Sequence, residues 1–317
     1  MAILINIMKS FVKALKLCGL AAVIILTGCP KIPDFPFLNQ GPVNSDIDVS
    51  SEADSHYVSF YDGGQGSAGS LRGRTAIVSI FTDDAGTSWD TEAEADREMM
   101  YDTLDNLRIS TDYLSEQAAK YGSDADFIWD WELYPDLYYT AEFQDSLITE
   151  YGDMYHVQSE WVVNNVDTTG LKDKYFADNV IYLFFFNTDF TNQVNPWYLG
   201  YSCSPDYYIE FCNIYVRFDD YFVTKPPTYA HEMMHCFGAH DLYYANEFIT
   251  QEYVDHLNST YSNDIMYTVY DSKDIGNDFT DLDAYYVGIT DHCDEVDKWN
   301  LAQSEHITET DNISTGG

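Results

Sequence analysis

The segment from His231 to Asp241 constrains the fold of this chain more than any other; it reads His-Glu-Met-Met-His-Cys-Phe-Gly-Ala-His-Asp. On a helix, His231 and His235 lie about one turn apart, so both imidazoles leave the same face. The Pro226–Pro227 pair precedes them, where proline suits a helix start. Gly238 follows at a point where the chain can take a positive φ and turn back. The segment therefore predicts a helix, a stop and a returning loop.

This arrangement of side chains indicates metal chemistry. Two neutral imidazoles at this separation can bind one zinc ion, and the returning loop can bring a third ligand. Glu232 lies beside the first ligand, where its carboxylate can take a proton from water that the metal activates. That is the physical basis of the H-E-x-x-H motif in metallopeptidases.

The segment resembles the metzincin signature H-E-x-x-H-x-x-G-x-x-H/D. His231, Glu232, His235 and Gly238 match it, and the third ligand position falls on Asp241. Most metzincins have histidine there, but a minority, including the snapalysins, have aspartate. A carboxylate oxygen is an accepted zinc ligand. The resemblance therefore implies that one zinc ion is the cofactor and that Glu232 is the general base.

Two alternatives for the third ligand stay open at this stage. His240 is next to Asp241, and histidine is the commoner and softer zinc ligand, so residue type favours His240 whereas position favours Asp241. In gluzincin-type peptidases the third ligand is a glutamate further along the chain, and Glu252 could play that part. Gly238 and Met266 would then have no role in the site.

Metzincins also carry a methionine in a tight turn beneath the metal. The stretch Ser262–Tyr267 has this form, with Met266 after a polar turn. A methionine there packs under the imidazoles and does not bind the metal. In some relatives a tyrosine near this turn stabilises the oxyanion, which makes Tyr267 and Tyr270 candidates for that role.

The remaining sequence predicts an α+β domain, and the resemblance implies a zincin-like one with a twisted mixed sheet, long helices, an active-site helix and a Met-turn. Four stretches have the composition of strands: Ile77–Phe81, Phe127–Trp131, Val180–Phe186 and Tyr208–Arg217. Val180–Phe186 is expected to be a buried central strand, and Tyr208–Arg217 is expected to lie near an edge of the sheet. Helical spacing of apolar residues predicts a long helix from Thr91 to Tyr121 and a second helix that includes Trp161–Asn165.

The first 29 residues have the form of an export signal. Three lysines precede an apolar run from Leu17 to Leu26, which is short for a membrane span. The stretch Leu26–Cys29 resembles the bacterial lipobox, which implies cleavage before Cys29 and lipidation of its thiol. We therefore expect an exported bacterial lipoprotein that its acyl chains hold at the membrane, facing the periplasm or the cell exterior.

Composition sets the expected domain boundaries. After the signal (1–29), residues 30–72 are rich in Pro, Gly, Ser and Asp and predict a flexible tether. Residues 73–300 form the expected peptidase domain, and the polar stretch 301–317 is expected to be a frayed tail.

Outside the signal, four cysteines remain: Cys203, Cys212, Cys236 and Cys293. An even number in an oxidising compartment predicts disulfides. Because Cys203–Cys212 would close a short local loop, the favoured second bridge is Cys236–Cys293, although spacing alone leaves the other pairings open.

The charge balance restricts the partners. The chain has 15 basic and 53 acidic residues. Loss of the signal would leave 12 basic residues and a net charge of −41. Such a field repels phosphate backbones, so we expect no nucleic-acid partner and membrane contact only through the lipid anchor. We expect a monomer, whose partner is a peptide or protein substrate.

The sequence thus favours a zinc-dependent endopeptidase. A lipid-anchored binding protein with an inactive zincin fold is the alternative of another class, although the presence of Glu232 argues against it. A hydrolase that acts on other bonds with the same zinc chemistry is a further alternative.

Overall fold

The computed structural model describes residues 67–144, 154–189, 199–201, 209–219, 222–246, 248–270 and 272–307. The predicted signal with Cys29, the tether as far as residue 66, Cys203 and the end of the tail lie outside these residues. Among the helices of the described part of the chain, none has the length and apolar character that crossing a membrane requires.

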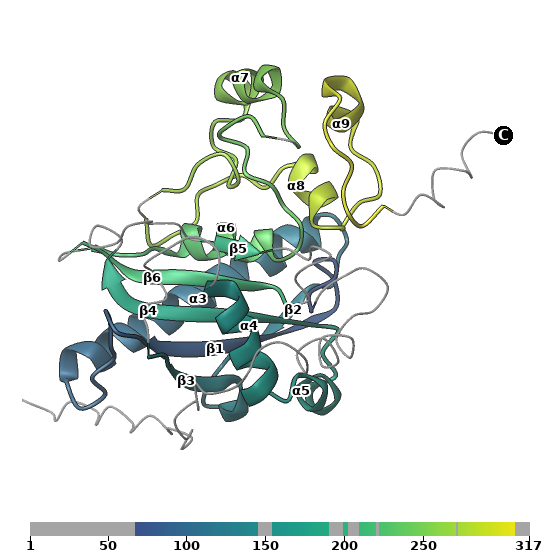
Figure 1. Ribbon diagram of the computed structural model, residues 1–317. Coiled ribbons are helices and arrows are strands. Elements are labelled where there is room, and N and C mark those ends of the chain that lie inside the picture. The colour runs from purple at the N-terminus through teal and green to yellow at the C-terminus, as the bar shows by residue number, and fades with distance from the viewer. Residues whose placement is uncertain are drawn as a thin grey trace, which may run out of the picture. The chain divides into compact units, whose positions relative to one another are not determined.

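The described strands form one seven-stranded sheet in the order β2-β1-β4-β6-β5, with β3 also paired to β1 and β7 also paired to β6 (Figure 1). Their bounds are β1 Arg74–Asp83, β2 Asp126–Ile128, β3 Tyr138–Glu142, β4 Asn179–Asp189, β5 Leu199–Tyr201, β6 Phe211–Asp219 and β7 Phe222–Val223. Strands β1 to β4 and β6 run parallel, whereas β5 and β7 pair with β6 in the antiparallel direction.

Some helices connect these strands, and α6 to α9 follow the last strand along the chain. Their bounds are α3 Glu94–Lys120, α4 Met154–Asn165, α5 Thr168–Tyr175, α6 Pro226–His235, α7 Gln251–Thr260, α8 Asp281–Tyr286 and α9 Asp294–Trp299, with a short 3-10 helix, η1, at Pro135–Leu137. The fold is therefore a mixed α/β arrangement with a largely parallel sheet, which is compatible with the predicted α+β class.

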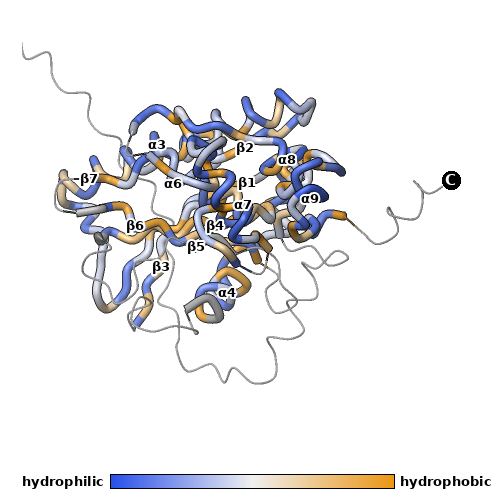
Figure 2. The backbone as a smooth tube through the Cα atoms, turned by 90° about the horizontal axis from the view of Figure 1, so that it is seen from above, coloured by the Kyte–Doolittle hydropathy of each residue, from blue (hydrophilic) through white to orange (hydrophobic). Residues whose placement is uncertain are grey.

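Strand β4 carries the centre of the core. Every side chain from Val180 to Phe186 is buried, as expected for a strand that is covered on both faces. Successive side chains alternate between the faces: the ring of Phe185 contacts Tyr229 of α6, and the ring of Phe184 contacts Trp161 of α4. Helix α6 also packs against α3. In Figure 2 the apolar positions follow the central strands β4 and β6.

Several sequence predictions are confirmed, and others need correction. The long helix and the central strand are present as α3 and β4, and the strand predicted at Phe127–Trp131 is reduced to the short β2. Some residues outside both predicted domain boundaries are buried. Leu71, placed in the tether, is fully buried, and Leu301 and Ser304, placed in the tail, are also buried. The buried residues of the described chain therefore include some from the stretches predicted to be tether and tail.

Candidate metal centre

The local sequence explains how α6 and its return loop form. The helix begins at Pro226 and ends at His235. After it, the amide of Gly238 donates to the carbonyl of His235, and the amide of Ala239 donates to that of Met234. This pair of hydrogen bonds is a Schellman motif, which requires a left-handed residue at its turn. Gly238 has φ +93°, so the predicted stop is confirmed.

The loop brings Asp241 back to the two histidines. Its Oδ1 lies 3.2 Å from Nε2 of His231 and 3.3 Å from Nε2 of His235, and the two Nε2 atoms are 3.2 Å apart. Tetrahedral ligands bound at about 2.0–2.1 Å are about 3.3–3.4 Å from one another. The three atoms therefore have the spacing of one face of a zinc coordination tetrahedron, and the group could hold a metal ion.

Backbone carbonyls orient both imidazoles. Nδ1 of His231 donates to the carbonyl oxygen of Ile265 at 2.9 Å, and Nδ1 of His235 donates to that of Ala239 at 2.7 Å. Because a carbonyl oxygen can only accept, each Nδ1 carries a proton and each Nε2 is directed at the shared point. Such outer hydrogen bonds fix the ring orientation and the tautomer of metal-binding histidines.

The electrostatics of the group favour positive charge. Burial lowers the pKa of His235, but the hydrogen bond to Asp241 and the charge of Asp241 outweigh burial and raise this pKa to about 9. Burial also opposes ionisation of Asp241, yet its hydrogen bonds with His231 and His235 hold its pKa well below the usual range. A carboxylate held charged in this way can accept a cation in place of the proton.

The two alternative third ligands lie elsewhere. The ring of His240 stacks on Phe248 at 3.9 Å between centroids and meets the edge of Tyr286 at 4.8 Å. Burial lowers the pKa of His240 to about 4, so it is neutral and packed. Glu252 is exposed on the first turn of α7. Among the described residues, the atom that completes the group that could hold a metal ion comes from Asp241.

Glu232 lies beside the ligand atoms but is not one of them. Its side chain is only 5% exposed, and its Oε1 is 4.0 Å from Nε2 of His231. This places a carboxylate within reach of a water molecule at the metal position, which is what a general base requires.

The turn that contains Met266 supports the ligands through its backbone. Oδ1 of Asp264 accepts a hydrogen bond from the amide of Met266 at 2.8 Å and so tightens the turn. Met266 is fully buried, and its carbonyl accepts from the amide of Leu242, just after the third ligand. The preceding residue, Ile265, supplies the carbonyl that orients His231. The turn therefore connects two of the three ligands.

One tyrosine beside the metal group has no distinguishing motif in the sequence. Tyr243 places its ring over His231, at 6.4 Å between centroids and with an interplanar angle of 26°. Burial, together with the charge of Asp241 and a hydrogen bond to it, raises the pKa of this phenol. Of the two tyrosines that the sequence offers for the oxyanion, Tyr267 is half-buried and Tyr270 is 47% exposed. Only its place two residues after Asp241 could have pointed to Tyr243.

The predicted Cys236–Cys293 bridge is wrong. Both residues have free thiols, and Sγ of Cys236 lies 3.2 Å from Sγ of Cys212. The reason is that Cys236 ends α6 over the sheet, whereas Cys293 precedes α9.

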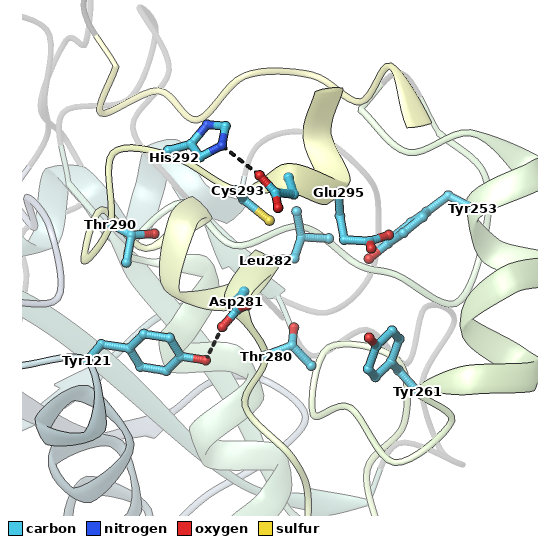
Figure 3. A pocket seen from close by; sticks show the side chains of 11 residues that line it. Tyr121, Tyr253, Tyr261, Thr280, Asp281, Leu282, Thr290, His292, Cys293 and Glu295 are labelled. Atoms are coloured by element: carbon cyan, nitrogen blue, oxygen red, sulfur yellow. Dashed lines mark hydrogen bonds and ion pairs between the residues drawn. The ribbon is translucent and has the colours of Figure 1, made fainter. Parts of the chain in front are cut away.

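A cavity of about 630 Å³ lies apart from the metal group, between the end of α3 and helices α7, α8 and α9 (Figure 3). None of the three ligand residues lines it. Its carboxylates already have partners: Asp281 accepts from Tyr121 at 2.9 Å, and Asp294 pairs with His292 at 2.8 Å. The metal group is therefore the stronger candidate for a functional site.

Comparison of the chain with protein-family models, with curated proteins and with solved structures finds no match. What the protein does therefore has to be inferred from the geometry of the metal group and its surroundings.

Proposed function

We propose that the protein is a zinc-dependent endopeptidase of the metzincin type. The observation that carries the proposal is the triangle of ligand atoms from His231, His235 and Asp241 with the carboxylate of Glu232 beside it. The Gly238 turn and the Met266 turn are further support, because Gly238 has a positive φ and the carbonyl of Met266 accepts a hydrogen bond from the residue after Asp241.

Zinc suits this donor set. Two imidazole nitrogens and one carboxylate oxygen make three protein ligands, and catalytic zinc sites combine three such ligands with one open position. Magnesium and calcium prefer oxygen donors, so two histidines argue against them. When bound, zinc supplies Lewis acidity that makes water a nucleophile near neutral pH.

The protein's own groups would then move the proton and hold the substrate. Glu232 takes a proton from the attacking water and gives it to the leaving amine, and its burial keeps the carboxylate close to the reacting atoms. The phenol of Tyr243, beside Asp241, can donate a hydrogen bond to the carbonyl oxygen of the substrate, where negative charge develops. No covalent intermediate with the protein is required.

A peptide substrate has a natural place on the sheet. Strand β5 pairs with β6 in the antiparallel direction at one end of the strand order, and it packs against α6. A strand at the edge offers unpaired backbone groups, to which an extended peptide can add. We propose that the substrate lies along β5 and crosses the metal position.

The test compares Glu232→Gln with a matched control, Glu252→Gln, which changes an exposed glutamate on α7. Metal content is measured by mass spectrometry of the purified full-length proteins, and activity is measured as casein digestion with and without a chelator. We expect one zinc ion in all proteins, and chelator-sensitive activity that only Glu232→Gln abolishes. Correctly folded protein without zinc would contradict the proposal.

The alternative of another class is a lipid-anchored binding protein with the same fold. It predicts zinc in all three proteins and no digestion of casein or of a mixed peptide library by any of them. Digestion that persists in Glu232→Gln would instead show that a different group acts as the base.

A further inference from the structure

Two cysteines that are distant in sequence meet between the sheet and the metal-binding helix. Cys212 lies on β6 and Cys236 caps the end of α6. Their sulfur atoms are 3.2 Å apart, and both residues are fully buried, with exposures of 0% and 1%. Both side chains are enclosed by the core, so neither thiol is accessible to solvent.

The contact connects the interior of the sheet to the site. In the strand register, Cys212 stands between Leu183 of β4 and Gly200 of β5, so it does not lie at an edge. Its thiol also donates to the carbonyl oxygen of Glu232 at 3.1 Å. Cys236 directly follows the ligand His235. A covalent link here would hold the end of α6 that carries the metal ligands.

The distance between the two sulfur atoms, 3.2 Å, is close to what a disulfide needs. An S–S bond is about 2.05 Å long, so the sulfur atoms need to approach by about an ångström, which small side-chain rotations provide.

We propose that Cys212 and Cys236 form a disulfide that fastens the metal-binding helix to the sheet. Two S–H bonds break and one S–S bond forms. The two electrons and two protons pass by exchange to a disulfide oxidant, a small-molecule or protein disulfide, whose S–S bond is reduced to two thiols. Because both thiols are buried in the folded chain, the bond forms during folding. The geometry alone carries this proposal, which stands whatever reaction the metal group performs.

Disulfide mapping tests the pairing directly. The full-length protein is folded with oxidised and reduced glutathione, alkylated without reduction under denaturing conditions, digested and analysed by mass spectrometry. We expect one cross-linked peptide pair that joins Cys212 to Cys236, with Cys293 alkylated. A Cys203–Cys212 or Cys236–Cys293 cross-link, or alkylation of both Cys212 and Cys236, would overturn the proposal.

A second measurement tests the effect on stability. For a loop of this length and a domain of this size, a disulfide is expected to raise the melting temperature by about 5–10 °C. Reductant should therefore lower the melting temperature of the unmodified protein and of the control Cys293→Ala. It should leave that of the Cys212→Ala/Cys236→Ala double variant unchanged. Equal sensitivity to reductant in the double variant would contradict the proposal. If the double variant does not fold, the mapping result decides.

Discussion

The assignment of the third metal ligand leads to a sharp prediction for Asp241→Asn. This substitution keeps the size of the side chain but removes the charge that lies 3.2 Å and 3.3 Å from the two imidazole nitrogens. Zinc sites with four protein ligands bind with about 10–16 kcal/mol, or roughly 2.5–4 kcal/mol for each ligand. Because about 1.4 kcal/mol corresponds to a factor of ten, loss of this ligand should weaken zinc binding by about 100- to 1,000-fold.

The matched control is His240→Ala, at the neighbouring position. The ring of His240 stacks on Phe248 and contributes no atom to the ligand group, so this variant should lose packing energy but keep its zinc affinity within about threefold. Competition with a chromophoric chelator measures both dissociation constants, and circular dichroism confirms that both variants are folded. A His240 variant that binds zinc as weakly as Asp241→Asn would refute the assignment, as would Asp241→Asn with unchanged affinity.

Four further predictions follow from particular contacts. Tyr243→Phe should lower kcat for a peptide substrate by about tenfold or more and change KM little, with full zinc content, since the role proposed for the phenol is to stabilise charge that develops in the transition state. An unchanged kcat in steady-state kinetics would exclude this role. Gly238→Ala should lower the free energy of unfolding by about 1–3 kcal/mol in urea titrations, because the φ of Gly238 is +93° and the new Cβ would lie 2.6 Å from Oε1 of Glu305. Equal stability of the variant and the unmodified protein would show that the turn adapts. Burial raises the pKa of Glu210 to about 8 in the folded protein, against 4.5 for the free side chain, so the folded state binds this proton more tightly and stability should fall as pH rises from about 4.5 to 8. Glu210→Gln should therefore be more stable than the unmodified protein at pH 8 by about 2–4 kcal/mol and lose that advantage near pH 4. Parallel pH profiles of urea unfolding for the two proteins would count against this prediction. Cys29→Ala should abolish incorporation of labelled palmitate in a bacterial host, and persistent labelling would place the lipid elsewhere.

The sequence by itself determined the features that depend on neighbouring residues. Histidines four residues apart share a helix face, and a glycine is needed where the helix ends with positive φ, so His231, His235 and the Gly238 turn could be predicted. The apolar run at Val180–Phe186 likewise predicted a buried strand, which is the central β4. These patterns follow from the geometry of the backbone and from the hydrophobic effect along a short stretch of chain.

The tertiary structure decided everything that depends on how distant segments meet. Asp241 and His240 are adjacent in sequence, and only the path of the return loop turns one toward the histidines and the other onto Phe248. Cys236 contacts Cys212 because α6 ends over β6, a relation that the spacing of cysteines cannot express. The packing of several elements together sets these positions, and no single stretch of sequence contains that information.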